Sequence, residues 1–162
     1  MTFADELVRA NQQYAAAFSR GRLPIPPGQR VAIVVCMDAR IDPARAFGLE
    51  EGTAHVIRNA GGRAADAVRS LVISQHLLGT REIVIVHHTD CGMLTFTDEQ
   101  LRRKLHDDLG VDTEIAFHAF TDLEASVRED VKMLQGSPLL LPNIPISGFI
   151  YDVHTGRVSR VV

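Results

Sequence analysis

The chain has 162 residues, of which 46% are hydrophobic and 23% charged, a composition typical of one soluble globular domain with a substantial core. The net charge is −3 and no long basic run occurs, which argues against binding nucleic acid or a membrane through bulk charge. The sequence contains neither a secretory signal peptide nor an apolar run of about 18 residues. We therefore expect a cytoplasmic protein.

Residues 1–29 are expected to form a helix and a linker. Apolar residues recur at helical spacing through residues 3–19 and predict an amphipathic helix there. Residues 21–29 contain three prolines and two glycines, which is typical of a connector. A helix set apart in this way can pack on its own domain or on a partner subunit.

Residues 30–162 are predicted to form a single α/β core. Apolar runs rich in β-branched residues predict strands at residues 31–36, 54–57 and 82–87, followed by closing strands at 146–152 and 157–162. Helices are predicted at residues 43–47, 64–78, 97–109 and 121–135. Strands that alternate with helices imply a mainly parallel β-sheet flanked by helices. Such sheets carry their sites outside the carboxyl ends of the strands.

Both cysteines of the chain lie at such strand ends. Cys36 closes the first predicted strand, and His88 and Cys91, which are separated by two residues, follow the third. One imidazole and two thiolates suit tetrahedral zinc, and three protein ligands leave the fourth position open, as in catalytic zinc sites. The alternative is a pair of buried thiols that bind no metal, and the neighbouring histidine argues against it.

An acidic and a basic residue accompany the first cysteine. Asp38 and Arg40 follow Cys36 at steps of two, so in an extended chain the three side chains point the same way. Asp38 would then lie beside the metal, with Arg40 within reach of it. Asp38 could accept a hydrogen bond from metal-bound water, or take the fourth ligand position itself. The alternative is a surface ion pair at a helix start, with Asp38 or Asp42 as the N-cap.

Three motifs resemble those of the β-class carbonic anhydrases, in particular the small prokaryotic members. They are CMDAR at residues 36–40, IRNAGG at 57–62 and HTDCGM at 88–93. The resemblance implies one zinc ion per subunit, bound by Cys36, His88 and Cys91. It also implies a homodimer or an assembly of dimers.

The same resemblance implies roles for residues around the metal. Asp38 and Arg40 would form the catalytic dyad, and the backbone N–H of Gly92 would position the substrate. The aromatic and glutamine pocket residues of the plant-type members are not identified in this sequence. Small or apolar groups are expected to line the pocket instead, near Ala39, Ala60 and Met93.

The function implied is the reversible hydration of CO2 to bicarbonate and a proton, by a zinc-bound hydroxide that the Asp–Arg dyad orients. Hydrolysis of carbonyl sulfide or carbon disulfide at the same zinc site is the enzymatic alternative. Further alternatives are a non-catalytic zinc protein, with Asp38 as a permanent fourth ligand, and a thiol enzyme, although the chain lacks C-x-x-C. Six other histidines are candidates for the proton shuttle, and the sequence does not choose among them.

The pair Gly61-Gly62 has two interpretations of equal weight. It either supplies the backbone freedom for a strand-to-helix turn, or it lets the backbone approach the site or a partner subunit closely. No nucleotide-binding glycine motif is present.

Overall fold

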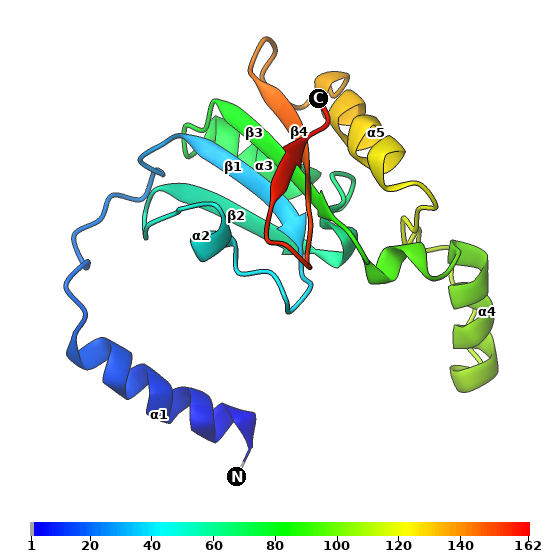
Figure 1. Ribbon diagram of the computed structural model, residues 1–162, viewed down its shortest axis with the longest axis horizontal. Coiled ribbons are helices and arrows are strands. Elements are labelled where there is room, and N and C mark those ends of the chain that lie inside the picture. The colour runs from blue at the N-terminus through cyan, green and yellow to red at the C-terminus, as the bar shows by residue number, and fades with distance from the viewer. Residues whose placement is uncertain (1) are drawn as a thin grey trace.

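A five-stranded sheet forms the centre of the computed structural model, which describes residues 2–162 (Figure 1). The strand order is β2-β1-β3-β4-β5. The first four strands in this order run parallel, and β5 pairs antiparallel with β4. The strands are β1 (Val31–Cys36), β2 (Ala54–Asn59), β3 (Glu82–His88), β4 (Ile146–Tyr151) and β5 (Val158–Arg160).

Helices flank this sheet and extend from it. They are α1 (Phe3–Ala16), α2 (Pro43–Ala46), α3 (Val68–His76), α4 (Asp98–Leu109) and α5 (Leu123–Gln135), with 3-10 turns η1 (Ala60–Gly62) and η2 (Gly92–Leu94). Apolar side chains of α3 and α5 share one buried cluster with the side chains on one face of β1 and β3. No helix within the described part of the chain is both long and apolar enough to cross a membrane.

The mainly parallel sheet flanked by helices is therefore confirmed, and the boundaries differ in a few places. The helix expected over residues 64–78 begins only at Val68, because residues 65–67 form a turn first, in which the N–H of Ala67 donates to the carbonyl oxygen of Ala64 at 2.9 Å. The helix expected over residues 3–19 ends at Ala16, and the second strand continues beyond residue 57 to Asn59.

The alternation of side chains along β3 decides which residues face the site. Ile83 and Ile85 pack in the cluster beneath α3 and α5, whereas Val84 and Val86 belong to the cluster on the other face. His87 and His88 continue this alternation, so consecutive histidines point to opposite faces of the sheet. His87 faces α5, where it contacts Ser126, and His88 faces the site.

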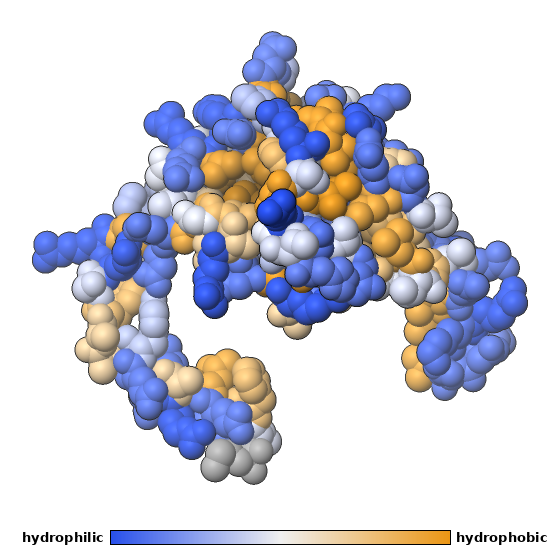
Figure 2. All heavy atoms as spheres, viewed as in Figure 1, coloured by the Kyte–Doolittle hydropathy of each residue, from blue (hydrophilic) through white to orange (hydrophobic). Residues whose placement is uncertain are grey.

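The helix α1 stands apart from the rest of the chain (Figure 1). None of its residues is buried, and apolar residues gather on one side of it (Figure 2). The hydroxyl of Tyr14 donates a hydrogen bond to the exposed carboxylate of Glu51, which lies outside this helix. Residues 30–162 of the same chain thus leave the apolar side of α1 uncovered.

Candidate metal centre

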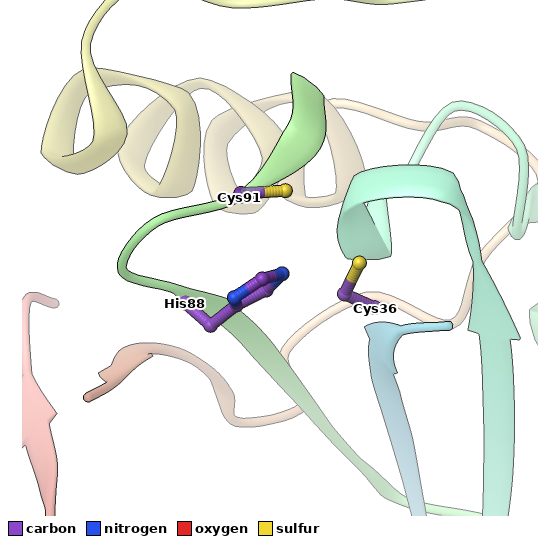
Figure 3. A group of neighbouring side chains, drawn as sticks. All are labelled: Cys36, His88 and Cys91. Atoms are coloured by element: carbon purple, nitrogen blue, oxygen red, sulfur yellow. The ribbon is translucent and has the colours of Figure 1, made fainter. Parts of the chain in front are cut away.

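Three side chains converge at the carboxyl edge of the sheet (Figure 3). Cys36 ends β1, His88 ends β3, and Cys91 directly precedes η2. All three residues are buried, and one ligand atom from each, the two sulfurs and a ring nitrogen, lie within 4.8 Å of one another. The topology brings them together because β1 and β3 are parallel neighbours whose carboxyl ends meet.

The His88 ring is oriented for metal binding through Nε2. Its Nδ1 lies 2.8 Å from the carbonyl oxygen of Thr89, which can only accept, so Nδ1 carries the proton. The buried Nε2 has no hydrogen-bond partner among residues 2–162. An unpartnered ring nitrogen beside two thiols, fixed by a hydrogen bond from the other nitrogen, fits a zinc ligand.

The two thiols affect each other's ionisation. The pKa of Cys36 is lowered, chiefly by the hydrogen bond from the Cys91 thiol, against the effect of burial, with further help from His88. The same bond, together with burial, raises the pKa of Cys91. Burial acts to lower the pKa of His88, yet the neighbouring Cys36 raises it. The site therefore stabilises a thiolate at Cys36, the ionisation state that a divalent cation requires.

Arg40 holds Asp38 next to this group. The guanidinium donates from Nε to Asp38 Oδ1 at 3.0 Å and from Nη2 to Oδ2 at 2.7 Å. These bonds keep the pKa of Asp38 well below its usual range, so the carboxylate is ionised. Asp38 Oδ2 lies 3.8 Å from His88 Nε2, which places the carboxylate beside the ligand atoms while it remains paired with Arg40.

Asp38 and Arg40 pair within a turn of the backbone, not along the extended segment that their spacing predicted. The chain does not stay extended after Cys36, because Asp38 Oδ1 accepts the backbone N–H of Arg40 at 2.9 Å and the Asp38 carbonyl accepts that of Ile41 at 3.0 Å. The expectation of three side chains along one extended segment is therefore wrong. Asp42, not Asp38, caps α2.

Asp90 is a neighbour of the site that lies within the motif HTDCGM but was not predicted to have a role. Its carboxylate accepts from Arg40 Nη1 at 2.7 Å, and its carbonyl oxygen accepts from Nη2 at 2.9 Å. Arg40 lowers the pKa of Asp90 as well. A carboxylate placed between two ligands in the sequence, His88 and Cys91, is the signal that could have found it.

The glycine pair brings the backbone against the site. The N–H of Gly61 donates to Cys36 Sγ at 3.3 Å. Gly62 has φ of 66°, and a Cβ built on it would lie 2.9 Å from the backbone nitrogen of Cys36 and 3.0 Å from the carbonyl oxygen of Val86. The structure thus supports both interpretations of this pair: Gly61 and Gly62 supply positive φ angles, 79° and 66°, between β2 and α3, and Gly62 also lets the backbone approach the site closely.

The remaining predicted residues lie around the ligand group. Gly92 is exposed at the first position of η2, where N–H groups have no partner within the turn. Met93 is buried and packs against Gly61, Ala60 is partly buried in the same cluster, and Ala39 is exposed.

Arg58 fixes the end of β1. Its Nη2 donates to the carbonyl oxygen of Cys36 at 2.9 Å and to that of Asp38 at 2.8 Å.

Comparison with known proteins gives consistent matches. The carbonic anhydrase family matches residues 31–158. Beta-carbonic anhydrase 1 of Mycobacterium tuberculosis is 45% identical over 162 residues, covering 99% of each chain. A crystal structure of carbonic anhydrase from Streptococcus mutans has a TM-score of 0.95 and 52% identity, over 100% of this chain and 99% of its own. Carbon disulfide hydrolase of Saccharolobus solfataricus is 30% identical, over 98% of this chain and 88% of its own length.

Proposed function

This chain belongs to the β-carbonic anhydrase family, and on that premise we propose that it is a carbonate dehydratase, a zinc lyase that interconverts CO2 and bicarbonate. The observation that carries the proposal is the unpartnered, buried Nε2 of His88 facing two thiols. The 45% identity to beta-carbonic anhydrase 1 over nearly the whole chain supports it.

Cys36, His88 and Cys91 would hold one zinc ion per subunit. When bound, zinc would act as a Lewis acid that lowers the pKa of a water molecule, so that the water gives up a proton to solvent and becomes nucleophilic enough to attack CO2. The two thiolates neutralise the formal charge of the dication, so they weaken this acidity relative to a site of three neutral imidazoles. Activity is therefore expected to rise toward alkaline pH.

Asp38 and Arg40 would orient the attacking water. The ionised Asp38 accepts a hydrogen bond from it, which directs a lone pair of the water oxygen toward the carbon of CO2. Arg40 holds Asp38 by two hydrogen bonds and so keeps the carboxylate from occupying the fourth ligand position. The N–H of Gly92 would help to position the substrate.

Stopped-flow CO2 hydration from about pH 6.5 to about pH 9, measured alongside zinc content, tests the proposal. We expect one zinc ion per chain and a rate that rises with pH. A fully zinc-loaded protein that does not hydrate CO2 anywhere in this range would reject it. That outcome would favour the non-catalytic alternative, in which Asp38 permanently completes the zinc shell.

Hydrolysis of carbon disulfide or carbonyl sulfide is the second candidate. The 30% identity to a carbon disulfide hydrolase over 98% of this chain is the observation that supports it. Both are linear molecules with an electrophilic carbon, so the same water could attack them. Hydrogen sulfide release from each should be compared with CO2 hydration on one preparation, and a higher kcat/KM for a sulfur substrate would favour this candidate.

We also propose that residues 1–29 form an arm that joins two copies of the 30–162 core into a homodimer. The apolar side chains of α1 are exposed, including Phe3 at 77% and Leu7 at 54%. The sheet offers a matching surface, since a groove over β1, β3 and β4 is lined by Ile33, Val84 and Phe149.

Light scattering after size-exclusion chromatography tests the arm. Leu7→Glu places a charge on the apolar side of α1 and is expected to shift the protein toward monomer. Gln12 lies on the opposite side of the helix, so Gln12→Glu is the matched control and should stay dimeric. A dimer unaffected by Leu7→Glu would reject the role of α1.

A further inference from the structure

A buried polar cluster lies behind the metal centre, on the face of the sheet that carries α5. His87 Nδ1 is 2.7 Å from Ser126 Oγ, and its Nε2 is 3.1 Å from Asp130 Oδ2. The three residues are 0%, 1% and 2% exposed. They are of the types found in nucleophilic triads, but such burial gives a substrate no access to the serine hydroxyl. Any effect of this cluster on the metal centre must therefore come from the backbone and side chains with which it forms hydrogen bonds and ion pairs.

Asp130 holds the loop that follows η1. Its Oδ2 accepts the backbone N–H of Ala64 at 2.8 Å, and its Oδ1 lies 3.0 Å from Nη2 of Arg63. The amide of Asn59 holds the same loop from within, since it accepts the backbone N–H of Arg63 at 2.7 Å and donates to its carbonyl at 2.9 Å. The loop is thus fixed to β2 through Asn59 and to α5 through Asp130.

The other end of this loop touches the metal centre. Gly61 lies two residues before Arg63 and donates its N–H to Cys36 Sγ at 3.3 Å. A hydrogen bond to a thiolate fixes the direction of the sulfur and withdraws charge from it, so it influences how strongly the sulfur binds a metal. The direction of the Gly61 N–H depends on where the loop from Gly61 to Ala64 is held.

We propose that Asp130 is a positioning residue of the metal centre, which acts through Arg63 and Ala64 to hold the Gly61 N–H on the Cys36 sulfur. This inference rests on the proposed function in one respect, that Cys36 is a zinc ligand. Arg63 is only 9% exposed, and its guanidinium carbon lies 5.2 Å from the centre of the Phe120 ring. Its charge therefore requires a buried counter-ion. Asp130 is that counter-ion.

A neighbouring carboxylate provides a matched control. Glu129 also approaches Arg63, at 4.0 Å, but its side chain is 70% exposed. An exposed and distant carboxylate contributes little to holding a guanidinium. Glu129→Gln therefore removes the same charge from the same helix while leaving the loop in place.

The experiment compares zinc binding by Asp130→Asn, Glu129→Gln and Val131→Ala, using competition with a chromophoric chelator. Asparagine keeps the shape of the side chain and can still accept the Ala64 N–H, but it loses the ion pair with Arg63. Val131 is buried in the apolar cluster beneath α5, so Val131→Ala lowers stability without touching the loop. The thiolate-to-cobalt absorption band of the Co2+-substituted proteins gives a second readout of the Cys36 sulfur.

We expect zinc affinity to fall about 10- to 100-fold in Asp130→Asn, with a shifted cobalt band, and to stay within about 2-fold in both controls. Wild-type affinity and an unchanged band in folded Asp130→Asn would overturn the inference. An equal loss of affinity in Val131→Ala would also overturn it, because general destabilisation would then explain the effect. If Asp130→Asn does not fold, Arg63→Met breaks the same contact from the loop and carries the same expectations.

These readouts do not depend on catalysis. A wild-type protein that binds zinc but does not hydrate CO2 would reject the proposed function and leave this inference standing. Conversely, an active wild-type enzyme whose Asp130→Asn variant binds zinc normally would reject only the inference.

Discussion

Replacing Gly62 with alanine is expected to destabilise the protein and to disturb the metal centre. The new methyl group would lie 2.9 Å from the backbone nitrogen of Cys36, 3.0 Å from the carbonyl carbon of Val35 and 3.0 Å from the carbonyl oxygen of Val86. All three atoms belong to the backbone of β1 and β3, so no side-chain rotation relieves the contact. The backbone at Gly62, with φ of 66°, is also one that alanine adopts poorly.

The expected cost has two parts. The left-handed conformation costs alanine about 1–2 kcal/mol. Insertion of a methyl group into a packed region costs about 1–3 kcal/mol more. The sum, about 2–5 kcal/mol, is a large share of the ~5–15 kcal/mol by which domains are usually stable.

Gly79→Ala separates the two parts. Gly79 has φ of 78°, but nothing lies within 4 Å of a Cβ built on it. Urea denaturation of the metal-free proteins should therefore show a loss of about 1–2 kcal/mol for Gly79→Ala and a further ~1–3 kcal/mol for Gly62→Ala. Zinc affinity should fall only in Gly62→Ala, because the shifted loop carries the Gly61 N–H away from the Cys36 sulfur. Equal losses of stability in the two variants would refute the argument from close approach.

Three further predictions concern the ligands and the acidic residue beside them. Cys91→Ser should lose both zinc and CO2 hydration, as measured by metal analysis and stopped flow, and an active zinc-free variant would contradict the assigned ligands. Asp38→Asn should keep its zinc while its hydration rate falls about 10- to 100-fold, and an unchanged rate would remove Asp38 from the mechanism. Because Arg40 holds the pKa of Asp38 below its ordinary value, ionised Asp38 stabilises the fold above about pH 4, and this contribution is lost as the pH falls through the lower folded-state pKa. Urea midpoints of the metal-free proteins between about pH 6 and about pH 2 should therefore decline less steeply for Asp38→Asn than for the wild type.

The central strands and the grouping of the three ligand candidates follow from local sequence patterns. The run Val31–Cys36 consists of apolar residues buried on both faces, and the end of a buried strand has a definite place in a parallel sheet. Cys36 and His88 therefore meet because their strands are neighbours. The turn after Cys36 was harder to predict, because the Asp38 side chain binds the backbone of Arg40 and bends a chain that the spacing suggested was straight.

Contacts between distant segments set the limit of prediction. The N–H of Ala64 donates to the carboxylate of Asp130, which lies 66 residues further along the chain. The pairing of Arg63 with Asp130 likewise depends on how α5 docks against the sheet. No periodicity or motif near either residue indicates such a contact.

The adjacent histidines of β3 have a consequence for how the chain tolerates insertions and deletions. Inserting or deleting one residue between Ile83 and His88 would exchange the faces of the two rings. His87, which contacts Ser126 and Asp130, would then point toward the sulfurs, and His88 would be buried under α5. The length of this segment is thus as strictly determined as the identity of its last residue. Length variation among relatives should instead gather where no such reversal follows, for example around α4, which has no buried residue.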